Sequence, residues 1–361
     1  MKPKSNNQIV ATLSCPFEGT KKIINYDAQK SIERLLNYNV LEEKSHATQL
    51  VSTSLDYFCC CYPEVKTDYL LAEFIDLASW ICILDDYIEI NSNFSSVHEK
   101  INYINILRQI IKNFNFKHVF TKSLSTKNNS LILLLSNILH RISEKLPRRY
   151  IKILIESLDN FFSALCWEIT YLKLDNKSIN DLLQIKSVSS GVFIANTMLV
   201  CFSELIVEDK YFFKSHIISM INSILLVMSL DNDIYSYNKE IMESGNSSIN
   251  VIKEFQTIFS IDERSSIQKT VSLRNHSLNV YMDLKSRLDN NESKIFGDYF
   301  NNLEKLIWGN LDFGQNSPRY NKKNIQNDDI IQVGKYAVEV KDDIYDLSEE
   351  ANSILSLLWW Y

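Results

Sequence analysis

The sequence contains few residues that form turns. Its 361 residues include only 7 glycines and 5 prolines, too few for a sandwich or barrel of many short strands. No apolar run approaches the roughly 18 residues of a membrane span, and the N-terminus lacks the apolar core of a signal peptide. Because 45% of the residues are hydrophobic, the chain can bury a large core. We therefore expect an all-α, cytoplasmic protein without stable membrane insertion.

The sequence also lacks a basic excess and paired metal-binding cysteines. Its formal net charge is −6, which argues against a nucleic-acid partner, because proteins that bind nucleic acids carry an excess of positive charge. Seven cysteines include the run Cys59, Cys60 and Cys61 but no C-x-x-C pair, so neither a zinc site nor a disulfide framework is indicated. Free thiols in a reducing compartment are the simplest expectation.

The stretch WICILDDYIEI, residues 80–90, places three carboxylates at the end of an otherwise apolar segment with helical period. Asp85 and Glu89 are four residues apart and share one face of a helix, while Asp86 is turned about 100° away. A solvated helix end would carry such charges without any function. The alternative is that an apolar helix ends at the mouth of a pocket, where its carboxylates bind a cation.

A second polar face occurs in SILLVMSLDNDIYSYNKEIMES, residues 223–244. Asn232, Ser236 and Glu240 are spaced by four residues, so that on a helix their oxygens form a column along one side. Mg²⁺ takes oxygen ligands of this mixed kind and is usually shared with the phosphates of a substrate. The two stretches therefore predict two groups of metal ligands on separate helices.

Three motifs together resemble those of one enzyme family. DDYIE, residues 85–89, resembles the aspartate-rich motif, and NDIYSYNKE, residues 232–240, resembles the Asn/Ser/Glu metal motif of microbial single-domain class I terpene synthases. WGNLDFGQNSPRY, residues 308–320, is similar to the family's C-terminal segment that ends in Arg-Tyr. The motifs occur in the family's order, and the resemblance covers about residues 20–320. It implies an all-α helical bundle around a central apolar cavity.

The resemblance implies three bound Mg²⁺ ions, with Mn²⁺ as a possible substitute. Asp85 would bind two ions, and the Asn/Ser/Glu motif would bind the third. Asp86 and Asp233 would support the ligands from behind. The metal ligands implied in this way are Asp85, Glu89, Asn232, Ser236 and Glu240.

The resemblance also implies residues that bind the substrate diphosphate and act in catalysis. Loss of diphosphate from an allylic carbon develops negative charge on the leaving group, and fixed cationic donors stabilise that charge. The donors implied are Lys186, Lys239, Arg319 and Tyr320. The carbocation that remains requires a dry apolar pocket with aromatic faces.

The motif QIKSVSSG places Lys186 where the family has a diphosphate-sensing arginine. Ser189, Ser190 and Gly191 follow where the helix is expected to break, because glycine and clustered serines weaken a helix interior. Lysine is a point charge and lacks the bidentate fork of arginine. If Lys186 binds the diphosphate, Lys186→Ala should greatly reduce turnover and Lys186→Arg should retain much of it.

Seven residues are expected to line the apolar pocket, on the same helix faces as the motifs or at the helix break. Packing in an ordinary core is the alternative for each of them. The residues are Ala78, Ile81, Cys82, Gly191, Leu225, Ser229 and Phe313.

The function implied is Mg²⁺-dependent ionisation of a prenyl diphosphate, with farnesyl diphosphate as the expected substrate. Cyclisation would give a sesquiterpene hydrocarbon or alcohol and release diphosphate, and the enzyme would be a monomer or homodimer. A diterpene synthase that uses geranylgeranyl diphosphate is the first alternative. A chain-elongating prenyltransferase would repeat an aspartate-rich motif where Asn232 and Ser236 stand. A catalytically inactive helical scaffold is the alternative outside enzymes.

The expected organisation is one domain over residues 1–320, with the first ~20 residues loose, and an appendage over residues 321–361. The polar run NKKNIQNDD that follows Tyr320 is typical of a flexible linker, and the segment up to the final SLLWWY suggests a helical tail. A chain that ends shortly after Tyr320 is therefore expected to fold.

Overall fold

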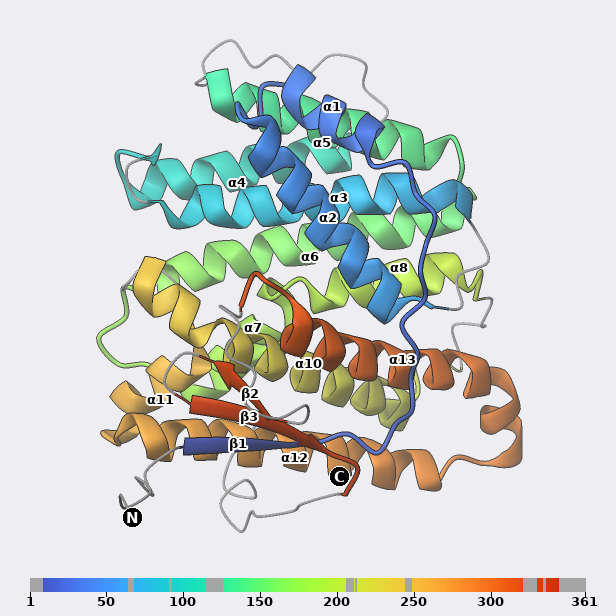
Figure 1. Ribbon diagram of the computed structural model, residues 1–361, viewed down its shortest axis with the longest axis vertical. Helices are drawn as coiled ribbons and strands as arrows, with labels where there is room; N and C mark the ends of the chain where they lie inside the picture. The colour runs from blue at the N-terminus through green and yellow to red at the C-terminus, as the bar shows by residue number, and fades with distance from the viewer. Residues whose placement is uncertain are drawn as a thin grey trace, which may run out of the picture. The chain divides into compact units, whose positions relative to one another are not determined.

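The computed structural model describes twelve helices and three short strands (Figure 1). It describes residues 9–63, 68–90, 93–113, 126–205, 211, 213–243, 249–320, 330–333 and 336–343. Helices dominate these residues, so the expected all-α class is confirmed, with one small sheet in addition. The chain divides into two compact units. The N-terminal unit comprises Lys21–Lys173 and Gly191–Leu205, and the C-terminal unit comprises Met1–Thr20, Leu174–Ser190 and Ile206–Tyr361.

Within the N-terminal unit, α3 packs against α2 and α5, while α6 packs against α4 and α8. The helices of this unit are α1 (Gln29–Asn37), α2 (Lys44–Cys61), α3 (Asp68–Glu89), α4 (Val97–Lys112), α5 (Thr126–Ser143), α6 (Arg148–Tyr171) and α8 (Val192–Phe202). The α3 side chains Phe74, Leu77 and Leu84 are fully buried. Trp80 is also buried and donates its indole N–H to the carbonyl of Leu131 at 2.8 Å. Trp80 is thus a structural residue that joins α3 to α5.

Two buried acidic residues near the start of α3 are neutralised by cationic side chains of the same unit. Asp76 lies 2.6 Å from Arg34 of α1 and 2.5 Å from Arg141 of α5. Glu73 lies 3.2 Å from Arg141 and 2.9 Å from Lys145. Because a buried carboxylate is unfavourable unless it is paired, these contacts fix α3 against α1 and α5.

The C-terminal unit is built around α10, which packs against α7, α11, α12 and α13. Its helices are α7 (Ile179–Ser189), α10 (Ser215–Glu243), α11 (Val251–Phe259), α12 (Glu263–Ser286) and α13 (Asn290–Asn316). By length and composition, Ser215–Met242 of α10 could cross a membrane, as could α7 and α8 if they formed one broken span. However, 83% of the most apolar part of α10 is buried in the protein, as in a core helix.

The C-terminal unit also contains a three-stranded sheet that the sequence pattern did not predict. β3 (Tyr336–Lys341) lies between β1 (Ile9–Ser14) and β2 (Ile330–Val333) (Figure 1). β1 pairs with β3 in parallel, from Ile9 opposite Tyr336 to Ser14 opposite Lys341, and β2 pairs with β3 in antiparallel. Strands of four to six residues give little periodic signal, and the partners of β3 include a strand more than 320 residues earlier in the chain.

This sheet packs against α12, contacts α10 and includes residues near both chain ends. Tyr336 is fully buried and donates its hydroxyl to the carbonyl of Ile234 in α10. Asn275 of α12 accepts from the backbone N–H of Ser14 at 3.1 Å and donates to the carbonyl of Thr12 at 3.1 Å. The expected loose N-terminus and the expected appendage thus both contribute strands to the C-terminal unit. The helical tail expected at the end of the chain lies outside the described residues.

The expected break in the QIKSVSSG segment is confirmed. α7 ends at Ser189, and α8 begins at Val192. Gly191 precedes α8 with φ 79°, a left-handed conformation that is unfavourable for residues with a Cβ atom. The backbone N–H of Ser190 closes α7 on the carbonyl of Lys186 at 3.2 Å.

Candidate active site

The aspartate-rich motif lies in the last turn of α3, where the sequence placed it. Asp85, Asp86 and Glu89 are all half-buried, and the last turn of the helix contains no basic residue. The C-terminal end of a helix carries a partial negative charge, so carboxylates there are locally unfavourable unless a cation is near. Burial lowers the pKa of Lys100 on α4, while the negative charge of Glu89 acts in the opposite direction. Three carboxylates thus gather at this end of α3.

The Asn/Ser/Glu motif lies near the C-terminal end of α10, in the other unit. Asn232 and Glu240 are half-buried and Ser236 is buried, and the last turn of α10 also lacks a basic residue. Of this motif, only Glu240 is charged and lies in the last turn of α10, where the helix dipole adds to its negative charge. Each motif favours a cation within its own unit.

The segment that follows α13 folds onto the Asn/Ser/Glu motif. Tyr320 accepts a hydrogen bond through its hydroxyl oxygen from Nδ2 of Asn232 at 3.3 Å. Its ring lies 6.4 Å from the ring of Tyr235 and meets Phe313 edge-on at 6.2 Å. The structure thus brings together two sequence motifs that are 88 residues apart. Arg319, next to Tyr320, is half-buried, as is Lys239 on α10.

Buried ion pairs hold α10 on both sides of Asn232. Asp231 and Arg274 of α12 are both fully buried, with the Arg274 Nε 2.8 Å from Asp231 Oδ1. Asp233 is fully buried and lies 2.8 Å from Nζ of Lys186 on α7. Burial raises the pKa of Asp233 to about 6, although the positive charge of Lys186 acts in the opposite direction.

Lys186 is itself buried, and its ammonium binds polar groups of the C-terminal unit. Besides its ion pair with Asp233, Nζ donates to the carbonyl of Ile249 at 3.0 Å. The ion pair joins Nζ to Oδ1 of Asp233 at 2.8 Å. The expected contact between Lys186 and a substrate diphosphate stays a prediction, and it would have to compete with these two partners.

Asn250, at the start of α11, belongs to none of the sequence motifs. Its amide nitrogen donates to the carbonyl of Asp233 at 2.9 Å and to Oε2 of Glu240 at 3.1 Å. Its amide oxygen caps α11 by accepting from the backbone N–H of Ile252 at 3.0 Å. An asparagine before an apolar helical segment is a recognisable N-cap signal, but nothing in the sequence links it to Glu240.

The residues predicted to line a pocket are divided between the two units. Ala78, Ile81 and Cys82 on α3 are half-buried, as is Gly191 before α8. In the C-terminal unit, Leu225, Ser229 and Phe313 are buried. Ser229 donates to the carbonyl of Leu225 at 2.8 Å and lies 2.8 Å from the hydroxyl of Ser190. Their role in a substrate cavity stays a prediction.

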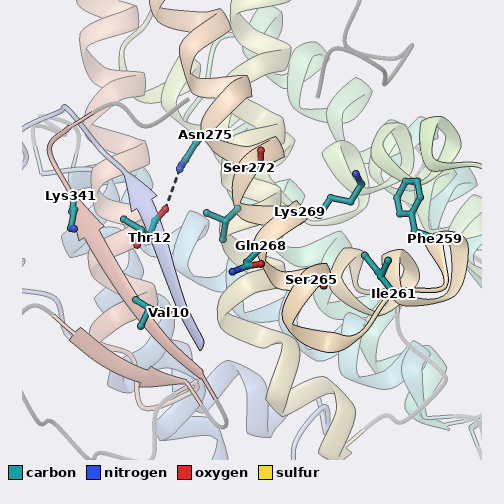
Figure 2. Close-up of a pocket in the computed structure, with 11 residues that line it drawn as sticks. Val10, Thr12, Phe259, Ile261, Ser265, Gln268, Lys269, Ser272, Asn275 and Lys341 are labelled. Atoms are coloured by element: carbon teal, nitrogen blue, oxygen red, sulfur yellow. Dashed lines mark hydrogen bonds between the residues drawn. The ribbon is translucent and has the colours of Figure 1, made fainter. Parts of the chain in front are cut away.

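A different cavity lies in the C-terminal unit beside the sheet (Figure 2). Its volume is about 840 Å³, and none of the predicted site residues lines it. Figure 2 shows Thr12 of β1 on one side, Lys269 of α12 near the other, and the hydrogen bond between Asn275 and Thr12. Because this cavity contains neither metal motif, it is not the candidate active site.

The Asn/Ser/Glu motif fits a divalent cation. The Ser236 hydroxyl is buried and has no hydrogen-bond partner among the described residues, a situation that costs about 1–3 kcal/mol unless a ligand satisfies it. The Asn232 nitrogen donates to Tyr320, which leaves the amide oxygen as the atom suited to a cation. Within the described residues, no three His, Cys, Asp or Glu side chains form a metal cluster. The fit therefore rests on a mixed set of oxygens, as Mg²⁺ prefers.

Two terpene synthases are similar to this chain in sequence. It is 21% identical over 255 residues to (+)-T-muurolol synthase ((2E,6E)-farnesyl diphosphate cyclizing) of Streptomyces clavuligerus, covering 70% of this chain and 59% of that protein. It is 26% identical over 141 residues to terpene synthase 1 of Tieghemostelium lacteum, covering 38% of this chain and 40% of that protein. The matches thus span from two fifths to three fifths of the length of these relatives.

Solved structures share the fold. A variant of a protein from ancestral sequence reconstruction has a TM-score of 0.73 at 15% identity, with 96% of this chain and 97% of that chain covered. Linalool/nerolidol synthase from Streptomyces clavuligerus, in complex with 2-fluorogeranyl diphosphate, has a TM-score of 0.64 at 11% identity, with 79% of this chain and 96% of that chain covered.

The family is established by a sequence match that contains both metal motifs. The family model described as "Terpene synthase family 2, C-terminal metal binding" matches residues 76–279. These residues are more than half of the chain, and they extend from α3 through α10 to α12. The chain therefore belongs to the terpene synthase family and contains its metal-binding domain.

Proposed function

We propose that this protein is a class I terpene synthase that ionises farnesyl diphosphate in a Mg²⁺-dependent reaction and cyclises the cation to a sesquiterpene. The observation that carries the proposal is the arrangement on α10. Asn232 is in contact with Tyr320, the Ser236 hydroxyl is buried and has no partner in the part of the chain that the structure describes, and Glu240 accepts a hydrogen bond from Asn250. Family membership and the farnesyl-diphosphate-cyclising relative support this assignment.

Each part of the chain would perform a separate task. Bound Mg²⁺ would neutralise the charge that develops on the departing diphosphate. Asp85 and Glu89 would hold ions at the end of α3, with Asp86 behind them, and the Asn/Ser/Glu motif would hold a third. Lys239, Arg319 and Tyr320 would donate to the diphosphate as its bond to the allylic carbon breaks and it takes the electron pair.

The rest of the pocket would keep the carbocation away from water. Apolar side chains, with Phe313 as the aromatic one, would stabilise a cation without quenching it. The residues proposed for this lining are Ala78, Ile81, Cys82, Gly191, Leu225, Ser229 and Phe313. Geranylgeranyl diphosphate is the second candidate substrate, because two Streptomyces diterpene cyclases also match the chain.

The test is to incubate the purified full chain with each prenyl diphosphate and Mg²⁺. Volatile products are identified by gas chromatography with mass spectrometry, and diphosphate release is measured in parallel. Cyclic fifteen-carbon products with farnesyl diphosphate are expected. Twenty-carbon products would favour the alternative substrate, and linear elongated products would favour a prenyltransferase.

Two ligand variants test the metal assignment. Asp85→Ala and Asn232→Ala should each abolish turnover while the helical circular dichroism signal remains, because these half-buried side chains contribute little to core packing. Asn222→Ala, at a half-buried site on the same helix α10, is the matched control and should retain activity. Normal turnover by either ligand variant, or by the wild type in excess chelator, would refute the metal assignment.

A further inference from the structure

We infer that Asn250 is a positioning residue that orients Glu240 for metal binding. The inference rests on the proposed function, because Glu240 is one of the proposed Mg²⁺ ligands. Asn250 itself is buried at the start of α11, and its amide nitrogen contacts the Glu240 carboxylate. It would act by fixing one carboxylate oxygen, so that the rest of the carboxylate is presented to the ion.

Both polar atoms of the Asn250 side chain make hydrogen bonds. Nδ2 donates to Oε2 of Glu240 at 3.1 Å and to the carbonyl of Asp233 at 2.9 Å. Oδ1 accepts from the backbone N–H of Ile252 at 3.0 Å. With both amide protons and the oxygen engaged, and with only 1% of the residue exposed, the side chain is held in one orientation.

Capping alone does not explain an asparagine here. Serine or aspartate would cap α11 about as well, because only an acceptor is needed. Asparagine adds two donors to that acceptor, and these donors bind two points on α10 that are separated by two turns. Aspartate at this position would have no donor at neutral pH, and its charge would repel Glu240. The choice of asparagine is therefore explained by its contact with Glu240 and not by the cap of α11.

The backbone around Asn250 is fixed independently, so that its amide is a rigid reference point. The next residue, Val251, donates its backbone N–H to Oδ2 of Asp233 at 2.7 Å. The preceding residue, Ile249, accepts from Nζ of Lys186 at 3.0 Å. Three consecutive residues thus tie the start of α11 to α10 and α7. Because Glu240 is held by this fixed segment, its carboxylate needs little reorganisation when an ion binds.

The test separates the cap from the contact with Glu240. Asn250→Ser retains a capping acceptor but cannot supply both amide donors. Asn250→Asp is close in size and also retains the cap, but it places an acceptor against Glu240. Asp262→Ala is the matched control, because Asp262 caps α12 in the same unit by accepting from Ser265 N–H at 2.7 Å and is not part of the metal motif.

Metal binding is measured directly on the full chain. Mn²⁺ is titrated in the presence of inorganic diphosphate, and free Mn²⁺ is followed by electron paramagnetic resonance. Both Asn250 variants should weaken the affinity for at least one ion by about 10–100-fold, the usual effect of losing such a supporting contact. With farnesyl diphosphate, the Mg²⁺ concentration for half-maximal rate should rise by a similar factor, and excess Mg²⁺ should restore much of kcat. The control should bind Mn²⁺ like the wild type.

The outcomes distinguish this inference from the proposed function. If the wild type binds Mn²⁺ with diphosphate and the Asn250 variants bind it equally well, the inference is overturned while the proposed function stands. If both variants fail to fold while Asp262→Ala folds, Asn250 is a structural residue, and the inference is also overturned. If the wild type neither binds Mn²⁺ nor forms a product, the proposed function fails first, and the inference fails with it.

Discussion

Replacing Lys186 with methionine should destabilise the protein whether or not substrate is present. The substitution removes the ammonium that lies 2.8 Å from Asp233 and leaves a fully buried carboxylate without its cation. Breaking a buried ion pair by removing one partner costs about 3–5 kcal/mol, since the remaining charge stays buried without a counter-charge. The hydrogen bond to the carbonyl of Ile249 is lost as well. We therefore expect the free energy of unfolding to fall by about 3–5 kcal/mol.

A double-mutant cycle isolates the interaction. Asp233→Asn alone should also destabilise the protein, because it leaves a buried ammonium. The double variant Lys186→Met with Asp233→Asn removes both charges and should recover most of the loss, giving a coupling energy of about 3 kcal/mol. Lys152→Met is the control for loss of an exposed ion pair, since Lys152 lies 3.8 Å from Glu156 with both side chains exposed. It should change stability by less than about 0.5 kcal/mol.

Urea denaturation followed by circular dichroism measures these values without substrate. A Lys186→Met variant within 1 kcal/mol of the wild type would refute the structural argument. If that stable variant also lost turnover with farnesyl diphosphate, the result would favour the prediction from sequence that Lys186 senses the diphosphate. The two roles are distinguished because one appears in stability without ligand and the other appears only in catalysis.

Two further predictions concern contacts with α10. Gly314→Ala should destabilise the protein by about 1–3 kcal/mol, because its Cβ would lie 2.4 Å from the Tyr235 ring. The Cβ of Gly297→Ala, on the same helix, would meet no atom of the described residues within 4 Å, so a thermal melt should show this variant unchanged or stabilised. A chain that ends near residue 325 should be less stable than the full chain, since it loses the strand that carries the buried Tyr336. Equal urea midpoints for the truncated and full chains would contradict that reasoning.

The sequence predicted the helices that carry the motifs because they are long and strongly periodic. α3 ends at Glu89 and α10 includes residues 232–240, as the apolar spacing indicated. The break before α8 was also predictable, since clustered serines followed by glycine disfavour a continuous helix. These features depend on local preferences, which a single sequence contains.

The contacts that fix the motifs were not predictable from one sequence. Asn250 and Glu240 are only ten residues apart, yet a side chain at a helix start gives no sign of which carboxylate it will contact. Arg274 and Asp231 are 43 residues apart, and β1 and β3 more than 320. Such pairings are set by tertiary packing. The sequence therefore suggested a diphosphate partner for Lys186, whereas the structure places an aspartate beside it.

The run Asp231-Asn232-Asp233 shows how α10 separates structural charges from the candidate ligand. Successive residues on a helix point about 100° apart, so the side chains of the two aspartates leave the helix on either side of Asn232. Each aspartate is fully buried, and each meets one cation, from Arg274 of α12 or Lys186 of α7. A buried charge of this kind resists displacement, because moving it would leave both partners unpaired in the core. The two pairs therefore fix the rotation of α10 about its axis. The amide of Asn232, between them, is held toward Tyr320 before any ligand binds.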